Sequence, residues 1–75
     1  MRVLGIDPGT AITGYAVVDE EVGELTLVEI GVIRTPANTP LPSRLQAIYE
    51  DLRTIIETYQ PEASAVEELF FSRNA

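Results

Sequence analysis

The 75-residue sequence predicts an α/β fold in which a three-stranded antiparallel meander leads into a helix and a fourth strand. Two observations predict it. Apolar, strand-like segments joined by short connections occupy residues 2–35, and short connections favour antiparallel neighbours. An apolar stripe at helical period then runs from residue 41 to residue 59, and a short apolar segment follows. We expect the strand order 3-2-1-4, with strands 1 and 4 parallel.

The first two strands flank a tight turn. Arg2–Asp7 (RVLGID) is a mostly apolar run that the Pro-Gly pair at residues 8–9 ends, and residues 13–19 (TGYAVVD) follow as the second strand. The small residues Gly14 and Ala16 share one face of this second strand. Another group can therefore approach that face closely.

The third strand follows a hairpin. The polar stretch 19–24 (DEEVGE) predicts the turn, and residues 25–35 (LTLVEIGVIRT) predict a longer strand. Regular alternation would divide its side chains between two faces: Thr26, Val28, Ile30, Val32 and Arg34 against Leu25, Leu27, Glu29, Gly31 and Ile33. Residues 35–42 contain three prolines and predict a loop.

The helix carries the strongest periodic signal. Its apolar residues form a single stripe: Leu41, Leu45, Ile48, Tyr49, Leu52, Ile55, Ile56 and Tyr59. We expect Pro42 or Ser43 to open the helix, Pro61 to close it, and both tyrosines of the stripe to lie in the core. The polar face opposite is expected to be solvated. Residues 63–67 (ASAVE) then form the fourth strand.

The predicted topology brings two carboxylates together. A strand-helix-strand crossover is right-handed, and the strongly apolar first strand needs a neighbour on both sides, so the fourth strand pairs with it. Asp7 ends the first strand and Glu67 the fourth, and adjacent parallel strands are about 4.8 Å apart. Both carboxylates then lie at the carboxyl end of the sheet, where such sheets bind ligands. Because the chain has no histidine or cysteine, the pair favours a hard cation, Mg²⁺ or Mn²⁺.

The charges are distributed unevenly. The formal net charge of −7 taken alone argues against a nucleic-acid partner. The acidic hairpin, however, is expected at the far end of the sheet, whereas Arg34, Arg44 and Arg73 are expected near the carboxylates, where they suit a phosphate backbone. No apolar run is long enough to span a membrane and no signal segment is recognisable, so a cytoplasmic protein is expected.

Three blocks of the sequence resemble a known family. GIDPGTAITGYAVV at residues 5–18, LPSRLQAIYEDL at 41–52 and AVEELFFSRN at 65–74 are similar, in order and spacing, to the N-terminal part of RuvC-type Holliday-junction resolvases. The resemblance implies an RNase H-like fold and a metal-dependent endonuclease with two ions in its complete site. It also implies a homodimer that nicks a four-way DNA junction symmetrically in recombination and repair. Junction-binding and branch-migration motor proteins are the implied partners.

The resemblance assigns roles to individual residues. The family's first catalytic aspartate and its glutamate, both metal ligands, fall on Asp7 and Glu67. A phenylalanine that handles the junction falls on Phe70. A basic residue, more often lysine in the family, and an asparagine fall on Arg73 and Asn74. The family's two further ligands from a C-terminal helix, its fifth strand and its remaining helices have no match here. Residues 1–75 are therefore expected to be the N-terminal portion of a single RNase H-like nuclease domain, inactive alone.

Other interpretations stay open at this point. Asp, Pro and Gly are ordinary turn residues, so Asp7 taken alone favours a turn role. Glu68 competes with Glu67, because neighbours on a strand point to opposite faces, and the resemblance favours Glu67. Thr10 and Thr13 are expected only to satisfy the backbone of the turn. An actin-like or sugar-kinase-like ATPase would instead use Asp7 and Thr10 around Mg-ATP, and a non-catalytic interaction fragment would have no affinity for metal.

Overall fold

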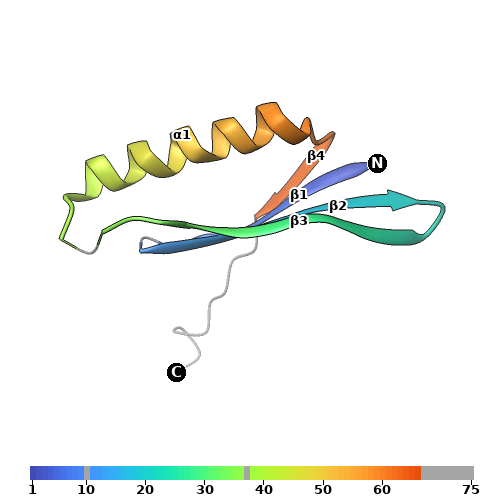
Figure 1. Ribbon diagram of the computed structural model, residues 1–75, viewed down its shortest axis with the longest axis horizontal. Coiled ribbons are helices and arrows are strands. Elements are labelled where there is room, and N and C mark those ends of the chain that lie inside the picture. The colour runs from blue at the N-terminus through green and yellow to red at the C-terminus, as the bar shows by residue number, and fades with distance from the viewer. Residues whose placement is uncertain (10, 37, 67–75) are drawn as a thin grey trace, which may run out of the picture.

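A four-stranded mixed sheet with one helix across one face makes up the fold (Figure 1), as a computed structural model describes it for residues 1–9, 11–36 and 38–66. The elements in chain order are β1 Arg2–Asp7, β2 Ile12–Glu21, β3 Glu24–Arg34, α1 Leu41–Tyr59 and β4 Ala63–Val66. The strand order is β3-β2-β1-β4, with β1 antiparallel to β2 and parallel to β4. The predicted α/β fold and the order 3-2-1-4 are confirmed.

The hairpin between β2 and β3 is tighter than the sequence predicts. β2 continues to Glu21, and only Val22 and Gly23 form the turn, both with positive φ, at 50° and 83°. Two positive φ values in a two-residue loop match the twist of the flanking strands. The predicted turn over residues 19–24 was therefore too long, because Asp19 to Glu21 stay in the ladder opposite residues 24–26.

A β-bulge changes the faces of β3. The register with β2 shifts between Val17, opposite Glu29, and Val18, opposite Leu27, so Val28 is an extra residue. The predicted regular alternation along β3 is wrong for this reason. Exposed apolar side chains from both sides of the bulge, which alternation would separate, share the face away from α1: Leu25, Leu27, Ile30 and Val32.

The helix α1 spans Leu41–Tyr59. It begins one residue before Pro42, the earlier of the two predicted starting residues. Pro42 occupies the first turn, where a missing N–H costs nothing. At the other end Gln60 adopts the left-handed conformation and its N–H donates to the Ile56 carbonyl at 2.8 Å. Pro61 follows, as predicted for the end of the helix.

The core lies between α1 and the sheet. Leu4, Val17, Ile33 and Ile55 are buried, and Ile48, Leu52 and Tyr59 pack against them. Tyr49, predicted in the core, is 63% exposed. At 100° per residue, Ile48, Leu52, Ile55 and Tyr59 fall within about 60° of one another, whereas Tyr49 lies about 100° round from Ile48. The apolar stripe is therefore wider than the face that the sheet covers.

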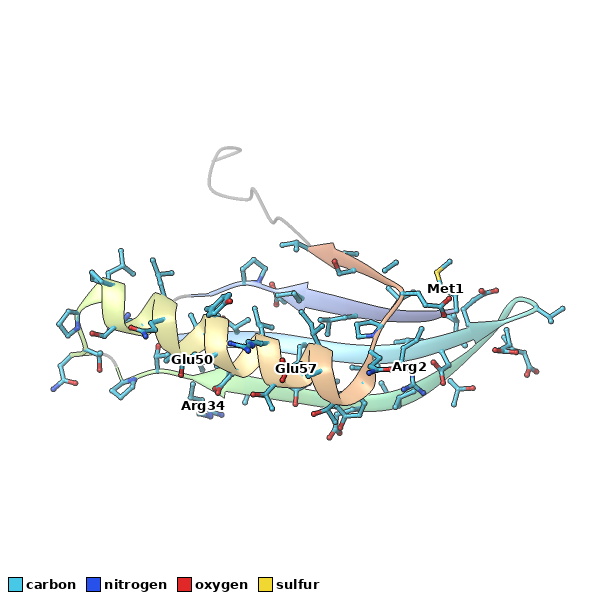
Figure 2. All side chains as sticks on the ribbon, turned by 90° about the horizontal axis from the view of Figure 1, so that it is seen from above. Met1, Arg2, Arg34, Glu50 and Glu57 are labelled. Atoms are coloured by element: carbon cyan, nitrogen blue, oxygen red, sulfur yellow. The ribbon has the colours of Figure 1, made fainter. Side chains whose placement is uncertain are left out.

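Polar contacts attach the C-terminal end of α1 to the sheet. The Arg2 guanidinium donates to both carboxylate oxygens of Asp19, at 2.8 and 2.9 Å, and to the Tyr59 carbonyl at 3.0 Å. The Tyr59 hydroxyl in turn donates to Glu29 Oε2 at 3.2 Å. Figure 2 shows Arg2 beside the end of the helix.

The described part of the chain contains no helix with the length and apolar character that a membrane span needs.

Candidate metal and nucleic-acid site

Asp7 is the last residue of β1, at the carboxyl end of a strand that has neighbours on both sides. It pairs with Gly14 of β2, and a Cβ added to Gly14 would lie 3.7 Å from the Asp7 Cβ, so both residues share one face. The buried Leu4 and Val17 belong to the opposite face, which α1 covers. The exposed Asp7 carboxylate therefore stands on the face of the sheet away from the helix.

The parallel pairing of β1 with β4 is confirmed up to the residue before Asp7. The register pairs Gly5 with Ala65 and Ile6 with Val66. Glu67, predicted beside Asp7, lies outside the described residues, as do Glu68, Phe70, Arg73 and Asn74. The pairing thus reaches the residue before Asp7 on one strand and the residue before Glu67 on the other.

The turn after Asp7 is closed by a buried threonine. The Thr13 hydroxyl donates to the Gly9 carbonyl at 2.7 Å and accepts from the Gly9 N–H at 3.4 Å, and Thr13 is only 2% exposed. The backbone role predicted for Thr13 is confirmed, while Thr10 lies outside the described residues. A second contact, from the Thr35 N–H to the Ala11 carbonyl at 3.0 Å, was not predicted. It joins two backbone groups, so no side-chain type in the sequence marks it.

A shallow hollow of about 630 Å³ lies beside Asp7 on the face away from α1. Its floor is made of small residues from three strands, Gly5, Gly14, Ala16 and Ala65, and Ile30 and Val32 line one side. The close approach predicted from Gly14 and Ala16 is available there. The contributions of Gly5 and Ala65 were missed, although both follow the same small-residue signal on neighbouring strands.

Two of the predicted arginines lie at the carboxylate end of the sheet. Arg34 ends β3 opposite Ile12, two residues beyond the rung that Val32 shares with Gly14 (Figure 2). Two strand spacings and two residues put the Arg34 Cα roughly 12 Å from that of Asp7, on the same face. Arg44 lies in the first turn of α1, on the helix side of the sheet. The sheet therefore separates Arg44 from the Asp7 carboxylate.

The acidic side chains of the β2–β3 hairpin lie at the opposite end of the sheet. The hairpin carries Asp19, Glu20, Glu21 and Glu24, and it lies at the other end of the β2 strand from the Asp7–Gly14 pair. Glu50 and Glu57 lie on the exposed surface of α1 (Figure 2). Within the described ranges, no group of three or more acidic, histidine or cysteine side chains is arranged to hold a metal ion. Asp7 therefore belongs to no such group within those ranges.

The comparison with protein families decides the relationship. The family model described as "Crossover junction endodeoxyribonuclease RuvC" matches residues 3–75. The chain belongs to the RuvC family. Curated RuvC relatives from Chloroflexus aggregans and Heliobacterium modesticaldum are 55% and 54% identical over 74 residues, which is 99% of this chain. That match covers 45% and 46% of the relatives, so the chain spans just under half of their length.

Solved structures agree with the RuvC assignment. Thermus thermophilus RuvC in complex with a Holliday junction substrate superposes with a TM-score of 0.85 at 35% identity, covering 95% of this chain and 46% of that one. The RNase H-like fold expected from the sequence is therefore confirmed. An Aquifex aeolicus member of the Ppx/GppA family also superposes, with a TM-score of 0.67 at 17% identity, and that likeness shows the fold alone. The RuvC relatives do not favour the ATPase interpretation of Asp7 and Thr10.

Proposed function

We propose that this chain is the N-terminal portion of a single nuclease domain that resolves four-way DNA junctions by paired, symmetric nicks in recombination and repair. The observation that carries the proposal is the position of Asp7, exposed at the carboxyl end of β1 while the parallel strand β4 runs alongside up to Val66. Membership of the RuvC family supports the same reaction. The whole protein would act as a cytoplasmic homodimer together with junction-binding and branch-migration motor proteins.

Asp7 and Glu67 are the proposed catalytic metal ligands. Continuing the β1–β4 register beyond Ile6 and Val66 supports a position for Glu67 next to Asp7. The described geometry at Asp7 fits a hard cation: the carboxylate is exposed, and within the described ranges its oxygens have no hydrogen bond or ion pair. The complete site would hold two ions, Mg²⁺ or Mn²⁺. When bound, they would activate a water and stabilise the leaving oxygen of a phosphodiester.

The chain itself would hold the ligand and the DNA. Asp7 supplies the carboxylate, and the ladder to Gly14 fixes the backbone of Asp7. The hollow of small residues beside it allows a bulky group to approach the sheet closely. Arg34 on the Asp7 face and Arg44 on the helix side of the same end add positive charge against the negative total, which suits contacts to phosphate oxygens. Phe70, Arg73 and Asn74 are proposed as further DNA contacts, on the strength of the family resemblance.

Titration of Mn²⁺ into the purified chain tests the proposed ligands. We expect millimolar or tighter binding that Asp7→Asn and Glu67→Gln each weaken, because each removes one anionic oxygen donor. The matched control is Glu57→Gln, an exposed carboxylate on α1 far from the site. Equal affinity in all four proteins would refute the proposal, and tight ATP binding would revive the ATPase alternative. Junction cleavage is measured in the protein extended to the length of its relatives, where both ligand substitutions should abolish paired nicking.

A further inference from the structure

The Thr13 hydroxyl holds the turn that follows Asp7. Thr13 is the second residue of β2 and precedes Gly14, the ladder partner of Asp7. Its side chain is buried and reaches back across the turn to both polar backbone groups of Gly9. The Thr13–Gly9 contact therefore closes the loop one step beyond the rung that carries the Asp7 carboxylate.

The shape of the turn requires glycine at residue 9. A Cβ added at Gly9 would lie 2.2 Å from the Ile12 carbonyl oxygen, a distance that real side chains do not tolerate. Pro8 fixes its own φ and offers no N–H, so it cannot extend the β1 ladder beyond Asp7. Beside the ladder and the bond from the Thr35 N–H to the Ala11 carbonyl, the contact between Thr13 and Gly9 holds the backbone next to Asp7.

The chemistry at residue 13 is specific to a hydroxyl. Its cross-strand partner on the face under α1, Ile33, is buried and apolar, so valine would fill the same volume there. Valine can neither donate to the Gly9 carbonyl nor accept from its N–H, and buried polar groups without partners are costly. A serine would keep the hydroxyl and lose only a methyl group. The two substitutions separate hydrogen bonding from packing.

We propose that Thr13 is a positioning residue for the metal ligand Asp7, acting through the backbone of Gly9. The inference rests on the proposed role of Asp7 in metal binding. Loss of the hydroxyl would free the turn, let the last rung of the β1–β2 ladder open, and spread the Asp7 carboxylate over several orientations. Only a fraction of these would suit the ion, which lowers the apparent affinity by that fraction.

The first test compares Thr13→Val with Thr13→Ser in the full chain. We expect Thr13→Val to weaken Mn²⁺ binding about 3- to 10-fold, the ratio that one net hydrogen bond supports, and Thr13→Ser to stay within about 2-fold of the parent. Amide hydrogen exchange at Gly9 and Asp7 should accelerate in the valine variant alone. Thr26→Val, on the exposed surface of β3, is the matched control and should change neither measurement. Unchanged affinity in Thr13→Val, or equal losses in valine and serine, would overturn the proposal.

A second test needs no substitution at Thr13. Coupling between two sites is reciprocal, so if the Thr13–Gly9 contact favours the ion, Mg²⁺ must increase the protection of the Gly9 amide by the same factor. If saturating Mg²⁺ leaves the exchange rate of the Gly9 amide unchanged, the proposal is contradicted even if Thr13→Val does not fold. Asp7→Asn separates the two ideas: undiminished Mn²⁺ binding in Asp7→Asn refutes the proposed ligand, whereas binding lost in Asp7→Asn but kept in Thr13→Val refutes only the positioning role.

Discussion

Asp7 and Gly14 face each other on the last rung of the β1–β2 ladder, and the missing side chain of Gly14 leaves the Asp7 carboxylate uncovered. Glycine at residue 14 matters for the space beside Asp7 more than for the backbone. A Cβ at Gly14 would lie 3.7 Å from the Asp7 Cβ, an ordinary van der Waals distance, so the backbone alone tolerates a small side chain. What glycine preserves here is the space beside the carboxylate, which belongs to the hollow on that face.

Side-chain size at Gly14 should therefore control access to Asp7 more than it controls folding. We expect Gly14→Ala to keep its thermal stability and bind Mn²⁺ within about 2-fold of the parent. Gly14→Leu should bind about 10-fold more weakly, at the lower end of the losses seen beside metal ligands. Titration of Mn²⁺, with the melting temperature as a control for folding, measures both. Equal affinities for alanine and leucine would show that the space beside Asp7 is not needed.

Gly9 should be the glycine whose replacement costs most stability. Its added Cβ would meet the Ile12 carbonyl at 2.2 Å, and backbone rather than a flexible side chain would have to move. We expect Gly9→Ala to lower the free energy of unfolding by about 1–3 kcal/mol. Gly5→Ala is the matched control: its Cβ would lie 3.9 Å from the Ala16 carbonyl, and stability should stay the same or rise slightly. Urea unfolding measures the difference, and a neutral Gly9→Ala would contradict this geometry.

The Arg2–Asp19 pair should make the fold sensitive to acid. Hydrogen bonding from the Arg2 guanidinium lowers the pKa of the Asp19 carboxyl below its ordinary value, and the charge of Arg2 adds to this. A carboxyl with a lowered folded-state pKa stabilises the fold above its unfolded pKa, and the contribution disappears as the pH falls through the folded value. We expect the urea midpoint of the parent to fall more steeply below about pH 4 than that of Asp19→Asn.

A surface pair provides the control for this acid effect. Arg53 and Glu57 are also an ion pair, at 3.2 Å, but their side chains are 64% and 66% exposed. Exposed pairs of this kind contribute little, so Glu57→Gln should leave the acid profile of the parent unchanged. Parallel profiles for the parent and Asp19→Asn would show that the Arg2 contact does not act on folding.

Tyr59 should make the fold sensitive to alkali. Desolvation raises the pKa of the Tyr59 hydroxyl, and the hydrogen bond to Glu29 raises it further. A raised folded-state pKa means that the contribution is complete below the unfolded pKa and is lost as the pH rises through the folded value. We expect tyrosinate absorbance to show a late-titrating group above about pH 10 that Tyr59→Phe removes and Tyr49→Phe leaves in place. Loss of the late phase in Tyr49→Phe instead would refute the assignment.

Local patterns predicted most of the secondary structure because local interactions produce it. Prolines and glycines mark the ends of β1 and α1, and the periodic stripe places the helix within one or two residues. The chain order and the handedness of the crossover then limit the topology to the observed order β3-β2-β1-β4. The errors fall where a pattern has no local marker: the bulge at Val28, the two-residue turn at Val22–Gly23, and the exposed Tyr49.

The sequence by itself determined the order of the elements, the family, and the residue that stands at the end of the central strand, because apolar period, turn residues and ordered motifs are properties of the chain alone. Only the tertiary structure decided which groups meet. The Thr13 hydroxyl on Gly9, the Thr35 N–H on Ala11 and the hollow beside Asp7 depend on strand register and on the face that α1 covers. The register of the strands and the face of each side chain are set by packing across strands. A single bulged residue moves all the side chains that follow it on that strand to the other face.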